Sequence, residues 1–247
     1  MTAFHPDSPL VRRVHPSPNH APRRGKLDLI LIHYTGMASG AAALARLCDP
    51  AAEVSAHYFI AEDGDILQLV PEARRAWHAG ESCWAGETDI NSASIGIEIQ
   101  NGGHAFGAPA YPKAQIEAVI ALCRDIAHRR AIAPARILAH SDVAPGRKID
   151  PGEYFPWSEL AKEGVGHYVR PHLIGEDVPL APGAVGAKVA ALQEMLAVCG
   201  YDTSVSGAYD TKTVNAVAAF QRHFRPARVD GKADQSTIET LGDLLAR

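Results

Sequence analysis

The segment that most constrains the fold of this chain is a nearly continuous apolar run at residues 27–34, LDLILIHY. A strand that is apolar on both sides must be covered on both sides, as in the centre of a sheet flanked by helices. A second strand is predicted at residues 94–100, SIGIEIQ, with its isoleucines on one face and Glu98 on the other. A third, residues 136–140 (RILAH), ends on a histidine as the first run nearly does.

Other segments complete an α/β pattern. Residues 41–47 and 113–130 have the periodicity of helices, the second clearly amphipathic. Residues 55–60 and 66–70 read as two strands of a hairpin, joined by AEDGD. The predicted fold is therefore an α/β domain with a mixed central sheet flanked by helices.

The ends of the chain differ from this pattern. The first 25 residues carry five prolines and no periodicity, which suggests an extended arm on the domain surface. Three helical segments at about 185–199, 211–224 and 234–246 predict a compact three-helix domain. The expected organisation is an arm at 1–25, the α/β domain at 26–163, a linker at 164–182 and a helical domain at 183–247.

Composition excludes several partners. A formal net charge of -4 gives no electrostatic footprint for nucleic acid, and no apolar run is long enough to span a bilayer. The N-terminal segment lacks the apolar stretch of a secretory signal peptide, so we expect a cytoplasmic rather than a periplasmic protein. The four cysteines show no CxxC spacing and are expected to be buried thiols.

Two histidines, His33 and His140, each stand at the end of an apolar run, so neighbouring strands could bring them together. The segment that follows, HSDVAPGRKIDPG, is rich in turn formers and could fold back to add Lys148 and Asp150. Two imidazoles and one carboxylate leave an open fourth position on tetrahedral zinc. Such a site lowers the pKa of bound water to about 7 and polarises a carbonyl, as amide hydrolysis requires.

Hydrolysis also needs a general base and a group that stabilises the oxyanion. Glu98 is the best candidate for the base, because a carboxylate in an isoleucine-rich strand is costly to bury without a purpose. Lys148 is the best cation for the oxyanion.

The residue pattern alone leaves alternatives open. His57 and His78 compete as metal ligands, and Asp142 competes with Asp150, which could simply form an Asp-Pro-Gly turn. Glu98 could instead pair with an arginine.

At these residues the sequence resembles the zinc-dependent N-acetylmuramoyl-L-alanine amidases, whose fold is shared with peptidoglycan recognition proteins and phage-type amidases. The resemblance covers roughly residues 25–160. It is carried by IHYT around His33, SAHYFIAEDGDILQLVPEARRAWHAG, SIGIEIQN and, above all, the long ordered motif HSDVAPGRKIDPG.

The resemblance implies roles for individual residues. The zinc ligands would be His33, His140 and Asp150, with Glu98 as the catalytic acid or base and Lys148 beside the oxyanion. His57 would make a structural hydrogen bond. Candidate substrate contacts are Trp77, which suits a sugar face but could equally be buried in the core, His78 and Asn101.

A second resemblance, over about residues 180–247, is to the three-helix peptidoglycan-binding domain of wall hydrolases. It rests on Leu192-Gln193, Gly200-Tyr201, Gly207-Ala208-Tyr209-Asp210, Phe220-Gln221, Asp230-Gly231 and Thr237. After Asp230-Gly231 the chain has KADQST where that family commonly has Gly-x-x-Gly-x-x-Thr. The alternative is a helical cap packed on the first domain.

Together these resemblances imply hydrolysis of the amide between N-acetylmuramic acid, or its anhydro form, and L-alanine of the stem peptide. The partner would be a muropeptide or peptidoglycan. A wall-binding module suggests the intact sacculus, whereas a cytoplasmic protein would act on soluble anhydromuropeptides during recycling. The alternative from another class is a module that binds muropeptides without cutting them.

Overall fold

The computed structural model describes residues 4–246, and its core is a sheet built around strand β3 (Leu29–Tyr34). This strand pairs in parallel with β7 (Ser94–Ile99) on one side and with β8 (Ile137–Ala139) on the other. Five of its six residues are buried. The apolar run therefore forms a central strand, as its composition predicts.

The sheet continues beyond β7 in the order β1-β5-β4-β7-β3-β8. Strand β4 (Tyr58–Ile60) is parallel to β7, and β5 (Ile66–Gln68) returns antiparallel to β4 as the expected hairpin. The N-terminal segment adds β1 (Arg13–Val14) to the edge of this sheet. It also supplies β2 (His20–Pro22), which pairs with β6 (Arg74–Ala76) in a small second sheet.

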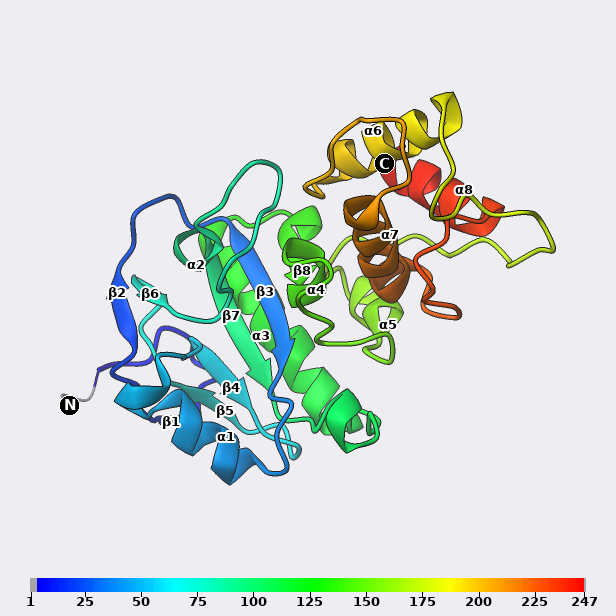
Figure 1. Cartoon of the computed structure of the whole chain (residues 1–247). Helices are drawn as coiled ribbons and strands as arrows, with labels where there is room; N and C mark the ends of the chain where they lie inside the picture. Colours follow the sequence, from blue (N-terminus) through cyan, green and yellow to red (C-terminus); the bar gives the residue numbers. More distant parts are fainter. Residues whose placement is uncertain (1–3, 247) are drawn as a thin grey trace.

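Helices cover the two faces of the large sheet (Figure 1). Helix α3 (Lys113–Arg130) packs on the face that carries the even-numbered residues of β3 and the isoleucines of β7. Helix α1 (Gly40–Leu47), which begins where the Ser39 hydroxyl accepts a hydrogen bond from the Ala42 amide, covers part of the opposite face. The alternation along β3 and β7 thus decides which side chains reach each layer.

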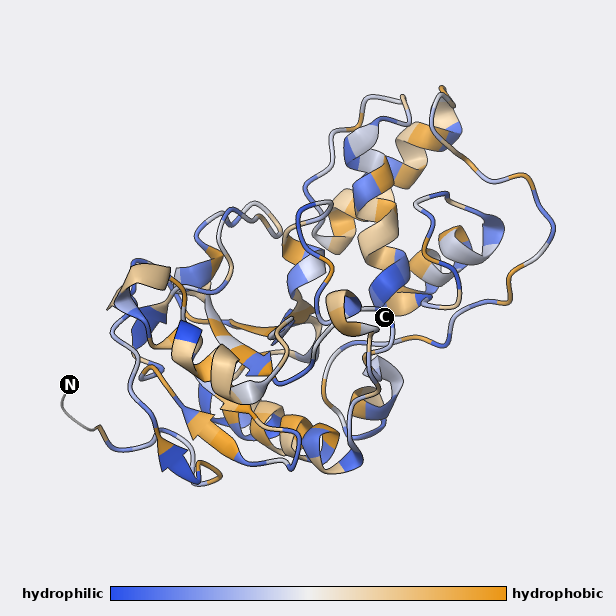
Figure 2. Ribbon diagram, turned by 60° about the horizontal axis from the view of Figure 1, so that its bottom comes forward, coloured by the Kyte–Doolittle hydropathy of each residue, from blue (hydrophilic) through white to orange (hydrophobic). Residues whose placement is uncertain are grey.

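The C-terminal helices α6 (Ala187–Cys199), α7 (Thr211–Phe224) and α8 (Gln235–Leu245) form the predicted three-helix unit. Asp210 and Asp234 cap α7 and α8 by accepting hydrogen bonds from backbone amides three residues ahead. Figure 2 shows apolar residues concentrated on the strands and on these helices. One contiguous apolar cluster contains residues of β3 together with residues of α7, so the unit is packed against the sheet.

Shorter elements connect these layers. They are helices α2 (Ile90–Ala93), α4 (His140–Val143) and α5 (Trp157–Lys162) and the 3-10 turns η1 (Pro50–Ala52), η2 (His104–Phe106) and η3 (Pro134–Arg136). The prediction that a strand ends on His140 was wrong by one residue. Strand β8 ends at Ala139 because the Asp142 carboxylate accepts the Ala139 amide and starts a helical turn.

Two further expectations concern the burial of the cysteines and the absence of a membrane-spanning segment. All four cysteines are free, but only Cys123 is buried, so the expectation of buried thiols holds for one of them. No helix within residues 4–246 combines the length and apolar character needed to cross a membrane.

Candidate active site

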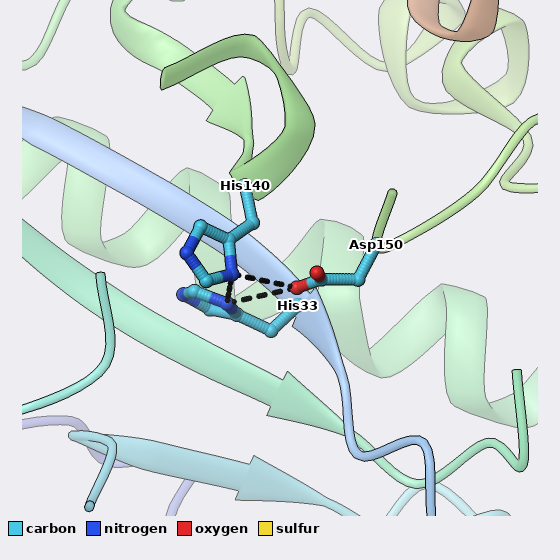
Figure 3. Close-up of side chains that lie close together, drawn as sticks. All are labelled: His33, His140 and Asp150. Atoms are coloured by element: carbon cyan, nitrogen blue, oxygen red, sulfur yellow. Dashed lines mark hydrogen bonds and ion pairs between the residues drawn. The ribbon is translucent and has the colours of Figure 1, made fainter. Parts of the chain in front are cut away.

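Three side chains converge at the end of the central strand (Figure 3). The Nδ1 atoms of His33 and His140 lie 2.9 Å apart, and Asp150 Oδ2 lies 3.1 Å from the first and 2.9 Å from the second. All three residues are buried. They form a group of potential metal-ligating atoms, as the sequence predicts.

Two chain segments supply this group. His33 is the fifth residue of β3, on the face opposite α3, while His140 opens helix α4 beside β8. The loop after α4 folds back, and the Ser141 amide donates to the Asp150 carbonyl over 3.0 Å. The turn formers of this loop therefore place a carboxylate beside a histidine only ten residues away.

The outer ring nitrogens of both histidines are held by the protein. His140 Nε2 lies 2.9 Å from the Ala79 carbonyl, which can only accept, so a neutral His140 carries its proton on Nε2. Its Nδ1 lone pair then faces the Asp150 carboxylate, so both atoms could bind one cation. Nδ1 of His33 faces the same point, while its Nε2 lies 3.1 Å from His78 Nδ1.

The donor set suits zinc. Tetrahedral coordination at about 2.0–2.1 Å separates ligand atoms by about 3.3 Å, a small expansion of the distances found here. Burial, and the neighbouring His140, lower the pKa of His33 to about 4, which keeps it neutral for ligation at pH 7. Burial alone would raise the pKa of Asp150, but His140 and His33 hold it well below its usual range.

Glu98 stands beside this group on β7, in direct register with His33. Burial, then the nearby Asp150, raises the pKa of Glu98 well above its usual range, and Lys148 opposes this. Its Oε2 atom is buried and has no hydrogen-bond partner among residues 4–246. Since Glu98 forms no ion pair within that range, the alternative of an arginine partner is wrong, and the carboxylate is free to act on a ligand.

A pocket of about 370 Å³ opens over these residues. His33, Glu98, His140 and Asp150 line it, and so does Lys148, whose ammonium makes no hydrogen bond or ion pair with any described residue. Helix α1 contributes another part of the wall. The structure thus brings the predicted ligands, the predicted base and the predicted cation to one cavity.

Two of the competing candidates have structural partners. His57 Nδ1 accepts the Gly96 amide at 3.0 Å and its Nε2 lies 3.0 Å from the Arg74 carbonyl, which confirms a structural hydrogen bond. Asp142 is fully buried and accepts from Ala139, Tyr201 and His223, so it is not a ligand.

The predicted substrate contacts divide three ways. Trp77 lines the pocket and is half-buried. His78 also lines it, but both of its ring nitrogens are engaged, by His33 and by Ser94 Oγ at 3.3 Å. Asn101 does not line the pocket; its side chain holds the following loop by donating to the Pro109 carbonyl and accepting the Gly103 amide.

The contact between His78 and His33 is the site feature that sequence reasoning missed. A signal for it stands in the strand SIGIEI, where a glycine interrupts the apolar residues. A Cβ atom on Gly96 would lie 2.5 Å from His78 Cγ, so the missing side chain makes room for the imidazole that orients His33.

Sequence comparisons agree with this geometry. The family model described as N-acetylmuramoyl-L-alanine amidase matches residues 23–153, and a peptidoglycan binding domain model matches residues 185–241. N-acetylmuramoyl-L-alanine amidase AmiD of Escherichia coli K12 is 40% identical over 240 residues, which cover 90% of this chain and 83% of AmiD. The 1,6-anhydro-N-acetylmuramyl-L-alanine amidase AmpD of Enterobacter cloacae is 34% identical over 164 residues, which cover 59% of this chain and 86% of AmpD.

Solved structures give the same result. Escherichia coli AmiD in complex with anhydro-N-acetylmuramic acid-L-Ala-D-gamma-Glu-L-Lys matches with a TM-score of 0.75 and 35% identity, over 94% of this chain and 92% of AmiD. AMPDH3 from Pseudomonas aeruginosa matches with a TM-score of 0.74 and 30% identity, over 99% of this chain and 98% of AMPDH3. The chain therefore belongs to the N-acetylmuramoyl-L-alanine amidase family.

Proposed function

We propose that this protein uses zinc to hydrolyse the amide bond between anhydro-N-acetylmuramic acid and L-alanine of the stem peptide. The observation that carries the proposal is the convergence of two imidazole nitrogens and a carboxylate beside the unpartnered Glu98 carboxylate in one pocket. The names of AmpD and the ligand of the AmiD complex support the anhydro sugar as the substrate class.

His33, His140 and Asp150 would hold the ion. Zinc bound there would supply a Lewis acid that polarises the substrate carbonyl and lowers the pKa of water. His78 and the Ala79 carbonyl hold the outer nitrogens of the two rings, so that both Nδ1 atoms face the place where the ion would bind.

Glu98 and Lys148 carry the proton and the charge. Glu98 takes a proton from the attacking water as the water oxygen bonds to the carbonyl carbon, and its raised pKa makes this carboxylate a stronger base than an ordinary glutamate. Lys148 stabilises the negative charge that develops on the carbonyl oxygen. Glu98 then passes the proton to the leaving nitrogen as the C–N bond breaks, which releases a lactyl carboxylate and the free amine of the stem peptide.

Trp77 is the proposed contact for the sugar. It lines the pocket from the segment after β6, and an indole ring suits the apolar face of a saccharide.

The cellular compartment decides which substrate the enzyme meets. We place it in the cytoplasm, and the free state of all four cysteines supports this. Fractionation of cells that express the full chain tests the placement. Recovery from the periplasm would contradict it and favour the sacculus as substrate.

Mass spectrometry of reaction products tests the proposed activity. The purified protein is incubated with anhydromuropeptide and with intact sacculi, each with and without a chelator. Release of free stem peptide that the chelator abolishes is expected from the anhydromuropeptide. Binding without release from either substrate would instead favour a module that recognises muropeptides without cutting them.

A further inference from the structure

A residue of the C-terminal helical unit reaches the turn that carries the metal ligands. His223, near the end of α7, lies with its Nδ1 atom 2.6 Å from Asp142 Oδ2. Both side chains are buried, at 1% and 0% exposure. Tyr201, from the loop after α6, donates its hydroxyl to the other oxygen of the same carboxylate over 2.9 Å.

Asp142 connects these two residues to the candidate zinc site. Its Oδ2 atom also accepts the Ala139 amide over 2.8 Å, which caps the first turn of α4. His140 is the first residue of that turn, and the next amide, Ser141, holds the Asp150 carbonyl. The orientation of the Asp142 carboxylate therefore bears on the backbone that places two of the three ligands.

The His223 ring has little freedom to turn away. It stacks on Trp157 with a centroid separation of 3.8 Å and on Phe224 at 3.8 Å. Its donor is therefore presented to Asp142 in one direction, and apolar rings exclude the water that could replace it.

Arg222, the residue of α7 next to His223, connects the C-terminal unit to the candidate site by a separate chain of contacts. Arg222 forms an ion pair with Glu153 at 3.4 Å, and Glu153 holds His104 at 3.0 Å. The other nitrogen of His104 lies 3.1 Å from the hydroxyl of Tyr34, which lines the pocket next to His33. Two consecutive residues of α7 thus lead, by separate chains of contacts, to two residues that line the candidate site, His140 and Tyr34.

We infer that His223, together with Tyr201, positions the metal ligand His140 through Asp142. The C-terminal unit is then part of the active-site scaffold in addition to any glycan contact of its own. The inference rests on the metal site of the proposed function but does not depend on which bond is cleaved.

Two variants of His223 separate its hydrogen bond from its packing. His223→Phe keeps a ring for the stack and removes the donor. His223→Asn removes the ring and keeps a donor near the Nδ1 position. Metal affinity is measured by competition with a chromophoric chelator, and ligand geometry by the visible absorption of the cobalt-substituted protein.

The inference predicts that His223→Phe weakens metal binding about tenfold and changes the cobalt spectrum, while His223→Asn restores both in part. In assays with anhydromuropeptide, the kcat of His223→Phe should fall by a larger factor than its KM changes. Cobalt spectra and metal affinities of His223→Phe that match the unsubstituted protein would overturn the inference.

A matched pair of tyrosines provides the control for stability. Tyr201→Phe removes a hydroxyl bonded to Asp142, whereas Tyr209→Phe removes one bonded to the Gly231 carbonyl within the C-terminal unit. Only Tyr201→Phe should alter the cobalt spectrum. Equal spectra for the two variants would contradict the inference, and this comparison remains available if His223→Phe does not fold. Normal metal binding without amide cleavage in the unsubstituted protein would instead count against the proposed function alone.

Discussion

His33 and Glu98 are direct neighbours in register on the parallel strands β3 and β7. In a parallel pair, residues in register project from the same face, so the candidate ligand and the candidate base share one side of the sheet. The isoleucines that alternate with Glu98 occupy the other side, under α3. The same alternation that builds the core thus separates catalytic from structural side chains.

Glu98→Gln should remain folded and bind zinc while kcat falls by about 10²–10⁴-fold, because the amide cannot accept the proton of water. Product release from anhydromuropeptide and metal content by mass spectrometry check this. Turnover comparable to the unsubstituted protein would remove Glu98 from its role.

Lys148→Met should lower kcat by about 10²–10³-fold with little change in KM, because the lysine acts on charge that develops during the reaction. Lys148→Arg should recover part of the loss. Steady-state kinetics on anhydromuropeptide distinguish this from a binding role, in which KM would rise and kcat would be preserved.

Gly96→Ala should displace His78 and, through it, His33, because the new Cβ atom would lie 2.5 Å from the imidazole. We expect metal affinity to fall by about 10–100-fold, as when an outer partner of a ligand is lost. Gly25→Ala is the control, since no atom lies within 4 Å of its Cβ position. Unchanged zinc affinity in Gly96→Ala would show that His78 does not orient His33.

Stability should depend on Glu72 at acidic pH. This buried carboxylate is bonded to Arg129, Arg130 and the Tyr58 hydroxyl. Burial alone would raise its pKa, but Arg129 and Tyr58 hold it at about 2, below the ordinary value of 4.5. The depressed pKa stabilises the fold by about 3 kcal/mol above pH ~4.5, and this contribution is lost as pH falls toward 2.

Glu72→Gln should therefore lower stability at pH 7 and flatten the acid limb of a denaturant titration. Glu163→Gln is the control, because the ion pair between Glu163 and Arg124 is more than half exposed on both sides. An unchanged acid limb in Glu72→Gln would assign the pH dependence to other groups.

Removal of metal should abolish activity and lower Tm. Free zinc at 100 times its dissociation constant stabilises a folded site by about 2.7 kcal/mol, or about 5–10 °C in Tm for a chain of this size. Calorimetry with chelator, followed by added zinc, measures the shift. The shift should disappear in Asp150→Asn, whose side chain lacks the charge.

The bounds of helices and strands were predicted best where the hydrophobic pattern fits only one type of secondary structure. Strand β3 and helix α3 lie within two residues of their predicted bounds, since an apolar run and a 3.6-residue period each fit one structure. The end of β8 was misplaced because a side chain, Asp142, rather than the apolar pattern, decides where the helical turn begins.

Site residues were predictable where the sequence is ordered as a motif, as in HSDVAPGRKIDPG. His78 was harder, because its partner depends on how distant segments meet. His78 faces a residue 45 positions away. The Asn101 side chain instead forms its hydrogen bonds within its own loop. In the sequence, an asparagine with this structural role cannot be distinguished from one that contacts a ligand.

The candidate ligands are unevenly spread along the chain. His140 and Asp150 are ten residues apart, whereas His33 precedes His140 by 107 residues. A chain emerging during synthesis presents the two later ligands in one local loop, and only the docking of β3 against β8 completes the set. Tight binding of the metal therefore requires that β3 has paired with β8, the two strands of the sheet that lie farthest apart in sequence among paired strands. The bound ion can thus act as a marker of correct assembly before any substrate is bound.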